Sequence, residues 1–154
     1  MGVRGQFIIL YVKSAVSLRR LKVTNMETKF NSQICTTREQ SERLLSLGLK
    51  KETADMALHF SYIDTNGNEY YIPYTIEHQC TGIHAWSLHR LMSMLPRCVD
   101  GGYHLVMSYD HIAYRTTYND VTTWWRGGGN TYDMIIKTIE WLIKEGYFNK
   151  EYLD

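Results

Sequence analysis

The sequence has little proline and no long hydrophobic run. Two prolines and the absence of any repeated or low-complexity tract in 154 residues argue against a long disordered linker. The apolar run FIILYV, residues 7–12, stops at Lys13, whereas a membrane helix needs about 18 apolar residues. A secretory signal fits poorly for the same reason, because its apolar region usually runs to about 7 to 15 residues. We therefore expect a globular protein that has no membrane partner.

The sequence also lacks the cysteine pattern of a disulfide-bonded protein. Its three cysteines, Cys35, Cys80 and Cys98, are odd in number and show no paired spacing. Such usage is typical of a reducing compartment. We therefore expect a cytoplasmic protein without a disulfide framework.

Acidic residues are absent from the first 25 positions, although the whole chain is nearly neutral. Residues 1–25 hold five of the 17 lysines and arginines, which leaves 12 basic against 16 acidic residues, a formal charge of −4, in residues 26–154. We interpret residues 1–25 as a basic leader or upstream extension, with a targeting segment or basic arm as the alternative, and residues 26–154 as a single domain. Because a domain of this charge is a poor general binder of phosphate, nucleic acid is a disfavoured partner.

Three segments show the capping residues and the periodicity of amphipathic helices. Each begins with a residue that caps a helix N-terminus and ends at a glycine or a proline. The segments are 36–48, with Thr36 and Glu39 at capping-box spacing and Gly48 after the last turn; 87–96, which starts at Ser87; and 130–146, which starts at Asn130 or Thr131.

Residues 57–77 form the clearest predicted β-hairpin. Aromatic and β-branched residues flank Asn66 and Gly67, a pair that favours a type I′ turn. Pro73 has no amide proton, so we expect the second strand to be an edge strand or to bulge there.

A second predicted hairpin, residues 101–118, completes the pattern of elements. Apolar and polar residues alternate on both sides of Asp110 and His111. The elements therefore follow the order helix, hairpin, helix, hairpin, helix. This order predicts an α+β fold, in which a small antiparallel sheet is built from two β-hairpins and three helices pack mainly on one face.

Four pieces of residues 26–154 carry a family resemblance. They are EQSERLLSLGLKKETADM, AWSLHRLMSMLP, MSYD and IEWLIKEGY, in this order. Through them the chain resembles a family of small uncharacterised proteins from gut anaerobic bacteria and their phages or mobile elements. The resemblance implies a cytoplasmic compartment and a phage or mobile-element setting, and it implies no activity. Residues 118–130 depart from the family pattern.

A metal site would have to use four residues between positions 78 and 89. Imidazole and thiolate are zinc donors, but structural zinc sites draw their ligands from two close pairs such as C-x2-C, and this spacing is absent. We therefore expect neither a metal nor another cofactor. The four candidate ligands are His78, Cys80, His84 and His89.

Histidine and acidic residues near the second hairpin support an alternative, enzymatic function. In a small hydrolase or nucleotide-modifying enzyme, His104 or His111 would act as the base and Asp110 would orient it, with Cys80 as a thiol nucleophile. No local nucleophile signature surrounds any cysteine. This hypothesis requires that the groups share one concave pocket.

The stretch TTWWRGGGNTYD, residues 122–133, combines tryptophans, an arginine and three glycines. It has no phosphate-loop motif, so GGGNTYD is interpreted as a turn that leads into a capped helix. Adjacent tryptophans in an extended segment cannot face the same core, and tryptophan and arginine are typical anchors of protein interfaces. We therefore predict a binding surface formed by Trp124, Trp125 and Arg126, helped by Tyr118.

Taken together, these patterns predict a protein that works by binding rather than by catalysis. We expect a small accessory protein of a phage or mobile element, whose partner is a host protein or a second copy of the chain. A small hydrolase or nucleotide-modifying enzyme is the first alternative. The second is a nucleic-acid-binding accessory protein, in which the tyrosine-rich strands would stack bases.

Overall fold

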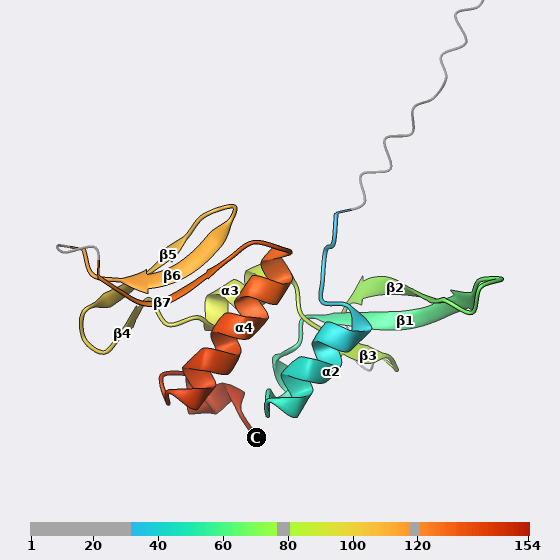
Figure 1. Ribbon diagram of the computed structural model, residues 1–154. Coiled ribbons are helices and arrows are strands. Elements are labelled where there is room, and N and C mark those ends of the chain that lie inside the picture. The colour runs from blue at the N-terminus through green and yellow to red at the C-terminus, as the bar shows by residue number, and fades with distance from the viewer. Residues whose placement is uncertain (1–31, 77–80, 118–120) are drawn as a thin grey trace, which may run out of the picture. The chain divides into compact units, whose positions relative to one another are not determined.

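The computed structural model describes residues 32–76, 81–117 and 121–154, and Gln33–Asp154 forms one compact unit. Residues 1–25 lie outside the described residues, as do His78, Cys80 and Tyr118. Figure 1 shows the elements of the described part. They are α2 (Arg38–Ser46), the 3-10 helix η1 (Lys51–Thr53), β1 (Met56–Ile63), β2 (Glu69–Thr75), β3 (Ile83–Ala85), α3 (Leu88–Met94), β4 (Cys98–Val99), β5 (Tyr103–Met107), β6 (His111–Arg115), β7 (Thr122–Gly127), α4 (Thr131–Lys144) and the 3-10 helix η2 (Lys150–Tyr152).

The strands pair antiparallel in two sheets, so the α+β class is confirmed and the single predicted sheet is wrong. One sheet has the order β2-β1-β3 and the other the order β4-β5-β6-β7. Both predicted hairpins form, as β1–β2 and β5–β6, but each belongs to a different sheet and gains further partners. Strand β7 was not predicted, because its ordered backbone depends on pairing with β6 more than on a clear strand pattern of its own.

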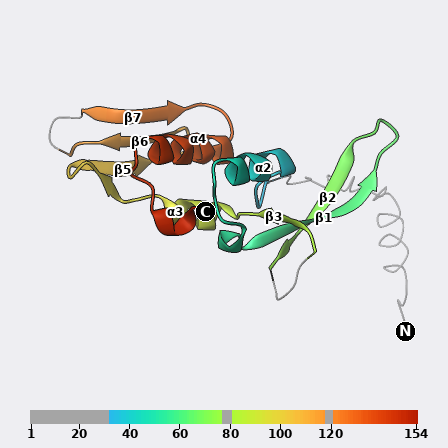
Figure 2. The same ribbon diagram turned by 90° about the horizontal axis from the view of Figure 1, so that it is seen from below.

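The helices also divide between the two sheets rather than covering one face. Helix α4 contacts β6 and β7, whereas α2 contacts β3 of the other sheet. Figures 1 and 2 show α2 and α4 side by side. Gln40 of α2 donates a hydrogen bond of 2.6 Å to Asp133 of α4. Arg43, one turn further along α2, forms an ion pair with Glu140, two turns further along α4. The two helices therefore run parallel.

The turn of the first hairpin differs from the prediction. Gly67 has a φ of +85°, but Asp100 is the one non-glycine residue with positive φ in the described part, so Asn66 does not adopt that conformation. The carboxylate of Asp64 instead accepts hydrogen bonds from the backbone amides of Asn66 (2.8 Å) and Asn68 (2.9 Å). The type I′ turn is therefore wrong, because the Asp64 side chain supports a wider turn that needs positive φ at the glycine alone.

The position of Pro73 is as predicted, since β2 is an edge strand. The amide of Ile76 donates to the carbonyl of Asp55 (3.1 Å). Hydrogen-bonded and non-hydrogen-bonded pairs alternate in an antiparallel ladder, so Pro73 and Leu58 form a non-hydrogen-bonded pair. The proline nitrogen thus faces the free edge of the sheet, which lacks a donor at this position.

Side-chain caps begin the second and third helices as predicted. The hydroxyl of Ser87 accepts a hydrogen bond from the amide of Arg90 (3.1 Å) at the start of α3. The side-chain oxygen of Asn130 accepts one from the amide of Tyr132 (2.7 Å) at the start of α4. The glycines of GGGNTYD therefore lead into a capped helix.

Helix α2 begins one residue later than predicted. Its N-cap is Thr37, which forms a capping box with Gln40. Thr36 is fully buried, and its hydroxyl bonds to the hydroxyl of Ser41 (2.7 Å) and accepts from the amide of Trp86 (3.0 Å). The prediction was wrong because the Thr36 side chain is buried in the core, so Thr37 caps the helix instead.

The main core lies between α4 and the four-stranded sheet. The buried face of α4 includes Ile135, Ile139 and Leu142, which pack in one cluster with Ile112 and Tyr114 of β6. The same cluster contains residues of α2 and α3, so it joins the helices to the sheet. No helix in the described part is long and apolar enough to cross a membrane.

Candidate functional site

Trp124 and Trp125 lie on opposite faces of β7. Trp124 faces α4, where its ring stacks on Trp141 with 4.9 Å between centroids and an interplanar angle of 11°. Its indole nitrogen donates a hydrogen bond of 3.3 Å to the hydroxyl of Thr138. Trp125 is 58% exposed. The alternation follows from the two-residue period of a strand, so only Trp125 is available to a partner in the way the sequence suggests.

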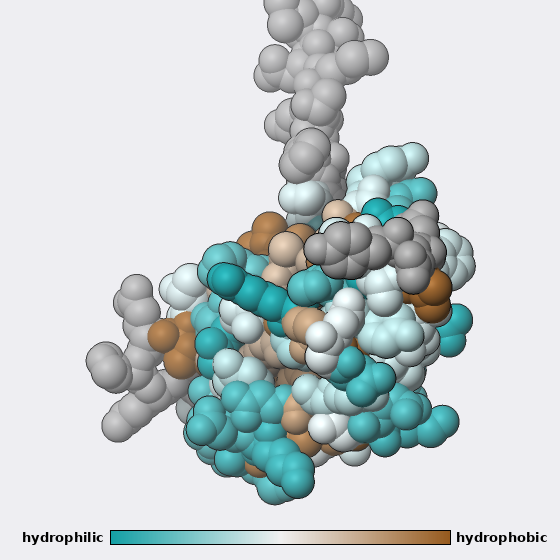
Figure 3. All heavy atoms as spheres, turned by 90° about the vertical axis from the view of Figure 1, so that its left-hand side faces the viewer, coloured by the Kyte–Doolittle hydropathy of each residue, from teal (hydrophilic) through white to brown (hydrophobic). Residues whose placement is uncertain are grey.

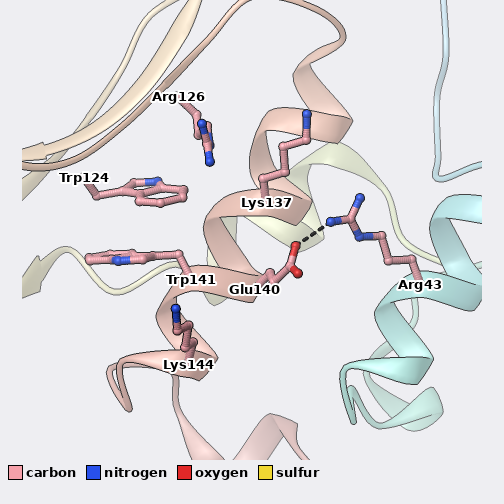
Figure 4. A pocket seen from close by; sticks show the side chains of 7 residues that line it. All are labelled: Arg43, Trp124, Arg126, Lys137, Glu140, Trp141 and Lys144. Atoms are coloured by element: carbon pink, nitrogen blue, oxygen red, sulfur yellow. Dashed lines mark hydrogen bonds and ion pairs between the residues drawn. The ribbon is translucent and has the colours of Figure 1, made fainter.

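Arg126 extends the tryptophan stack by one layer. Its guanidinium lies 4.9 Å from the ring centroid of Trp124, on the side away from Trp141, as Figure 4 shows. The favourable interaction between a guanidinium and an indole face holds Arg126 in place. Arg126 is thus positioned by β7 and by Trp124 together.

A basic pocket of about 320 Å³ opens beside this stack. Helix α4 supplies Lys137, Glu140, Trp141 and Lys144, whose spacing of three and four residues puts them on one face of the helix. Strand β7 adds Trp124 and Arg126, and α2 adds Arg43 (Figure 4). We call these seven residues the basic pocket.

The basic pocket carries four cations and one carboxylate. Glu140 is paired with Arg43, and both side chains are about half exposed. Among the residues that the structure describes, no carboxylate pairs with Arg126, Lys137 or Lys144. The pocket is therefore positive, although residues 26–154 have a negative total charge. Sequence reasoning missed it because total charge does not show where charges gather in space.

The three residues of the enzymatic hypothesis are only partly brought together. His111 Nδ1 lies 2.8 Å from Asp110 Oδ1, and this hydrogen bond is the main reason why the pKa of Asp110 falls below its usual value. His104 pairs with Arg115, four residues along β6 from His111, which corresponds to about 13 Å of strand. Asp110 and His111 thus form the acid and base pair that the enzymatic hypothesis requires, but His104 lies apart from them.

The cysteines in the described part do not supply a nucleophile beside this pair. Cys35 is buried, and burial, reinforced by the negative charge of Asp55, raises its pKa to about 11. A thiol of this kind is largely protonated at neutral pH and is a poor nucleophile. Cys98 lies at the edge of the second sheet, in β4. The thiol that the hypothesis used, Cys80, lies outside the described residues.

Two of the four candidate metal ligands fall within the described ranges. His84 lies in β3 and His89 is exposed on α3. Across residues 32–76, 81–117 and 121–154, no three histidine, cysteine or acidic side chains gather as a metal site would require. The other two candidates, His78 and Cys80, are outside those ranges.

The hairpin β1–β2 carries a second candidate surface that sequence reasoning considered only as a platform for bases. Its register places His59 opposite Ile72 and Tyr62 opposite Tyr70, on the same side of the sheet as Tyr74. The rings of Tyr62 and Tyr70 stack at 4.6 Å, and His59 packs edge-on against Tyr74 at 5.0 Å. We call Tyr62, Tyr70, Ile72 and Tyr74 the hairpin face; they are 53%, 43%, 46% and 50% exposed.

The side of the molecule that carries β4–β7 is mostly hydrophilic (Figure 3). In Figure 3, hydrophilic residues cover most of this side, and hydrophobic residues form small, separate areas. The exposed ring of Trp125, in β7, stacks loosely with His111, with 6.4 Å between centroids. Trp125 and Tyr109, in the turn between β5 and β6, are both exposed aromatic residues of this sheet. The hairpin face differs in that it groups four large side chains on one side of β1–β2.

Comparison with protein-family models, with curated proteins and with solved structures found no match. The class that the fold defines is an α+β protein with two antiparallel sheets.

Proposed function

We propose that this protein is a small binding module that associates with a second copy of itself through the hairpin face. The observation that carries the proposal is that Tyr62, Tyr70, Ile72 and Tyr74 lie together on one side of β1–β2 with about half of each side chain in water. Contiguous exposed apolar surface is unusual on a monomer and typical of an interaction site. The cytoplasmic phage or mobile-element setting of this module rests on the sequence resemblance alone.

The chemistry of the hairpin face suits a protein partner. Tyrosine contributes a large rigid ring and a hydroxyl that remains satisfied in a partly wet interface. The face has no acidic or basic residue among its four members. Of the nearby acids, Glu69 is held on the other side of the sheet by Arg38, and Asp64 accepts a hydrogen bond of 3.3 Å from the hydroxyl of Tyr70. A partner surface should therefore be uncharged and aromatic or aliphatic, which describes the hairpin face itself.

A second copy meets this requirement through two-fold symmetry. A two-fold axis brings the same patch of both subunits together, so the patch has to be complementary to itself. The stacked pair Tyr62 and Tyr70 and the aliphatic side chain of Ile72 form such a patch, because none of them repels its own copy. An interface of this kind is isologous and closes at two subunits.

Face-to-face packing is favoured over pairing along the strand edge. Continuation of the sheet through β2 would need a donor at each alternate residue of the free edge, and Pro73 provides none. The proposed dimer therefore joins two sheets by their side chains rather than by their backbones. Trp125, exposed on the other sheet, remains a proposed contact for a further protein partner, whereas Arg126 lies on the opposite face of β7 with Trp124.

The experiment is a measurement of mass in solution as a function of protein concentration, by sedimentation equilibrium or light scattering. Ile72→Lys places a charge at the centre of the hairpin face and should shift the protein to monomer. The matched control is Phe60→Lys, since Phe60 is as exposed on the same hairpin but packs against Tyr71 on the opposite side. The control should remain a dimer.

Circular dichroism and thermal unfolding separate loss of association from loss of folding. Both variants should keep the wild-type spectrum, because each substitution is at an exposed position. A wild-type protein that stays monomeric at the highest concentration reached, or equal behaviour of the two variants, would contradict the proposal.

A further inference from the structure

We infer that the basic pocket between α2, α4 and β7 binds phosphate groups. The site is separate from the hairpin face, so this inference does not depend on self-association. Four cationic side chains surround a cavity of about 320 Å³, and one carboxylate faces them. A surplus of unpaired positive charge around a concave surface attracts anions.

The cations are arranged for an anion rather than scattered over a surface. Arg126 is held against the Trp124 ring, and Trp124 is itself held by Trp141 and by the hydroxyl of Thr138. Arg126 thus loses little conformational freedom when it binds, and its planar guanidinium matches two oxygens of a phosphate. Lys137 lies opposite it as a more mobile point charge (Figure 4).

A ligand cannot bind in the pocket by stacking a base on Trp124, because both faces of this ring are covered. One face of Trp124 is covered by Trp141 and the other by Arg126. The rings of Tyr114 and Tyr147 also pack at tilted angles against Trp141, at 5.7 and 5.8 Å. The indoles therefore offer their edges to the pocket, and the edge of an aromatic ring is its positive part. Both the rings and the cations favour a negatively charged group.

The ion pair between Arg43 and Glu140 is part of the recognition. Because both side chains are about half exposed, the pair contributes little to stability and opens at small cost. Phosphate oxygens then replace the carboxylate of Glu140 as the partner of Arg43. The carboxylate of Glu140 repels the anion and lowers the affinity of the site.

The size of the cavity points to a small phosphorylated ligand. A volume of about 320 Å³ is at the lower end of the range of small-molecule sites, which runs from about 300 to 1,000 Å³. It has room for pyrophosphate or for the phosphate end of a larger molecule, such as a phosphorylated metabolite. The backbone of a nucleic acid presents the same chemistry and is the other source of such a group.

The test is calorimetric titration of the whole protein with inorganic pyrophosphate at low salt, repeated at higher salt. We expect one site per chain, with an affinity that falls as salt rises. Lys137→Gln should weaken binding about tenfold, the usual effect of losing one charge-assisted hydrogen bond. Glu140→Gln should tighten binding several-fold, because it removes the one opposing charge. Tightening is a result that a purely structural role of Glu140 would not produce.

The matched control is Lys51→Gln, which removes an exposed lysine in η1 outside the pocket. It should leave the affinity unchanged. Absence of binding at low salt, equal effects of Lys137→Gln and Lys51→Gln, or no gain with Glu140→Gln would each overturn the inference. A competition arm with a short single-stranded oligonucleotide identifies the source of the phosphate: displacement of pyrophosphate assigns a nucleic-acid backbone, and retention of pyrophosphate assigns a small ligand.

Discussion

Trp124 and Trp125 are adjacent in the sequence and lie on opposite faces of the same sheet. One ring stacks on Trp141 of α4 and positions Arg126, while the other is exposed above β6 and β7. The two tryptophans were predicted to act together in one binding surface. Trp124 packs in the core and Trp125 is exposed, so a double substitution would mix an effect of Trp124 on stability with an effect of Trp125 on binding.

Single substitutions of the two tryptophans should therefore differ. Trp124→Ala removes a partly buried ring from the main core and should lower the free energy of unfolding by about 2–3 kcal/mol. Trp125→Ala should change it by less than about 0.5 kcal/mol, as is usual for an exposed residue. Urea unfolding followed by circular dichroism measures both. Equal losses would show that Trp125 is part of the core.

A substitution at Gly127 tests where the Trp125 ring lies. A Cβ atom at this position would come within 2.5 Å of the Trp125 ring, which is the far end of a movable side chain. Gly127→Ala should therefore displace the indole and shift its fluorescence maximum. The carbonyl oxygen of Asp110, 3.1 Å from the new Cβ, must also move by a few tenths of an ångström. The same substitution in a Trp125→Leu background should leave the remaining tryptophan fluorescence unchanged. A shift that persists there would mean that another tryptophan responds.

Asp55 connects the start of β1 to the cap of α3. Its carboxylate accepts from both the amide (2.8 Å) and the hydroxyl of Ser87, which orients that hydroxyl toward the amide of Arg90. Asp55→Ala should lower the free energy of unfolding by about 2–3 kcal/mol, because two partly buried donors lose a charged acceptor. Ser87→Ala should cost about 1 kcal/mol. In a double-mutant cycle the two losses should not add, and simple additivity would show that the residues act independently.

Because burial raises the pKa of Cys35, we expect the folded protein to lose stability at alkaline pH. Its pKa in the folded protein is about 11, above the usual value of 9.0, so the unfolded chain loses its proton first as pH rises. Below pH 9 both states hold the proton and stability is unaffected; between pH 9 and 11 deprotonation favours the unfolded state, by an amount on the order of 1–2 kcal/mol. The difference in unfolding free energy between wild type and Cys35→Ala, followed across this range, isolates the contribution. A difference that does not change with pH would contradict it.

Thiol labelling gives a second measurement of the same residue. At pH 8 the folded protein should react with iodoacetamide slowly at Cys35 and readily at Cys98, which is exposed. Peptide mass spectrometry distinguishes the two sites. Equal rates in the folded state, with both rates rising together on unfolding, would show that Cys35 is accessible.

Local signals in the sequence predicted the helices well. Ser87 and Asn130 were identifiable because a side-chain cap depends on residues within three positions. Thr36 was misassigned to the cap of α2, since both it and Thr37 are suitable and only tertiary burial decides between them. The same limit explains β7, whose pairing partner lies at positions that no local pattern identifies.

The sequence predicted less of the candidate sites than of the fold. The alternation of Trp124 and Trp125 was predictable from strand geometry, but the stack of Trp124 on Trp141 was not, because it joins a strand to a helix. The basic pocket combines Arg43 with residues of α4 some ninety positions later, and no spacing rule connects them. The hairpin face needed the register of β1 and β2, which the bulge between Phe60 and Tyr62 alters.

The parallel pairing of α2 and α4 imposes an order on folding during synthesis. Gln40 and Asp133, which join the two helices, are 93 residues apart. At about 5–20 residues per second, α4 leaves the ribosome roughly 5–20 s after α2. Until then Leu44, which is fully buried in the finished core, belongs to a nascent helix whose neighbour has not been made. The core around Leu44 is therefore completed only after the last helix of the chain has been made.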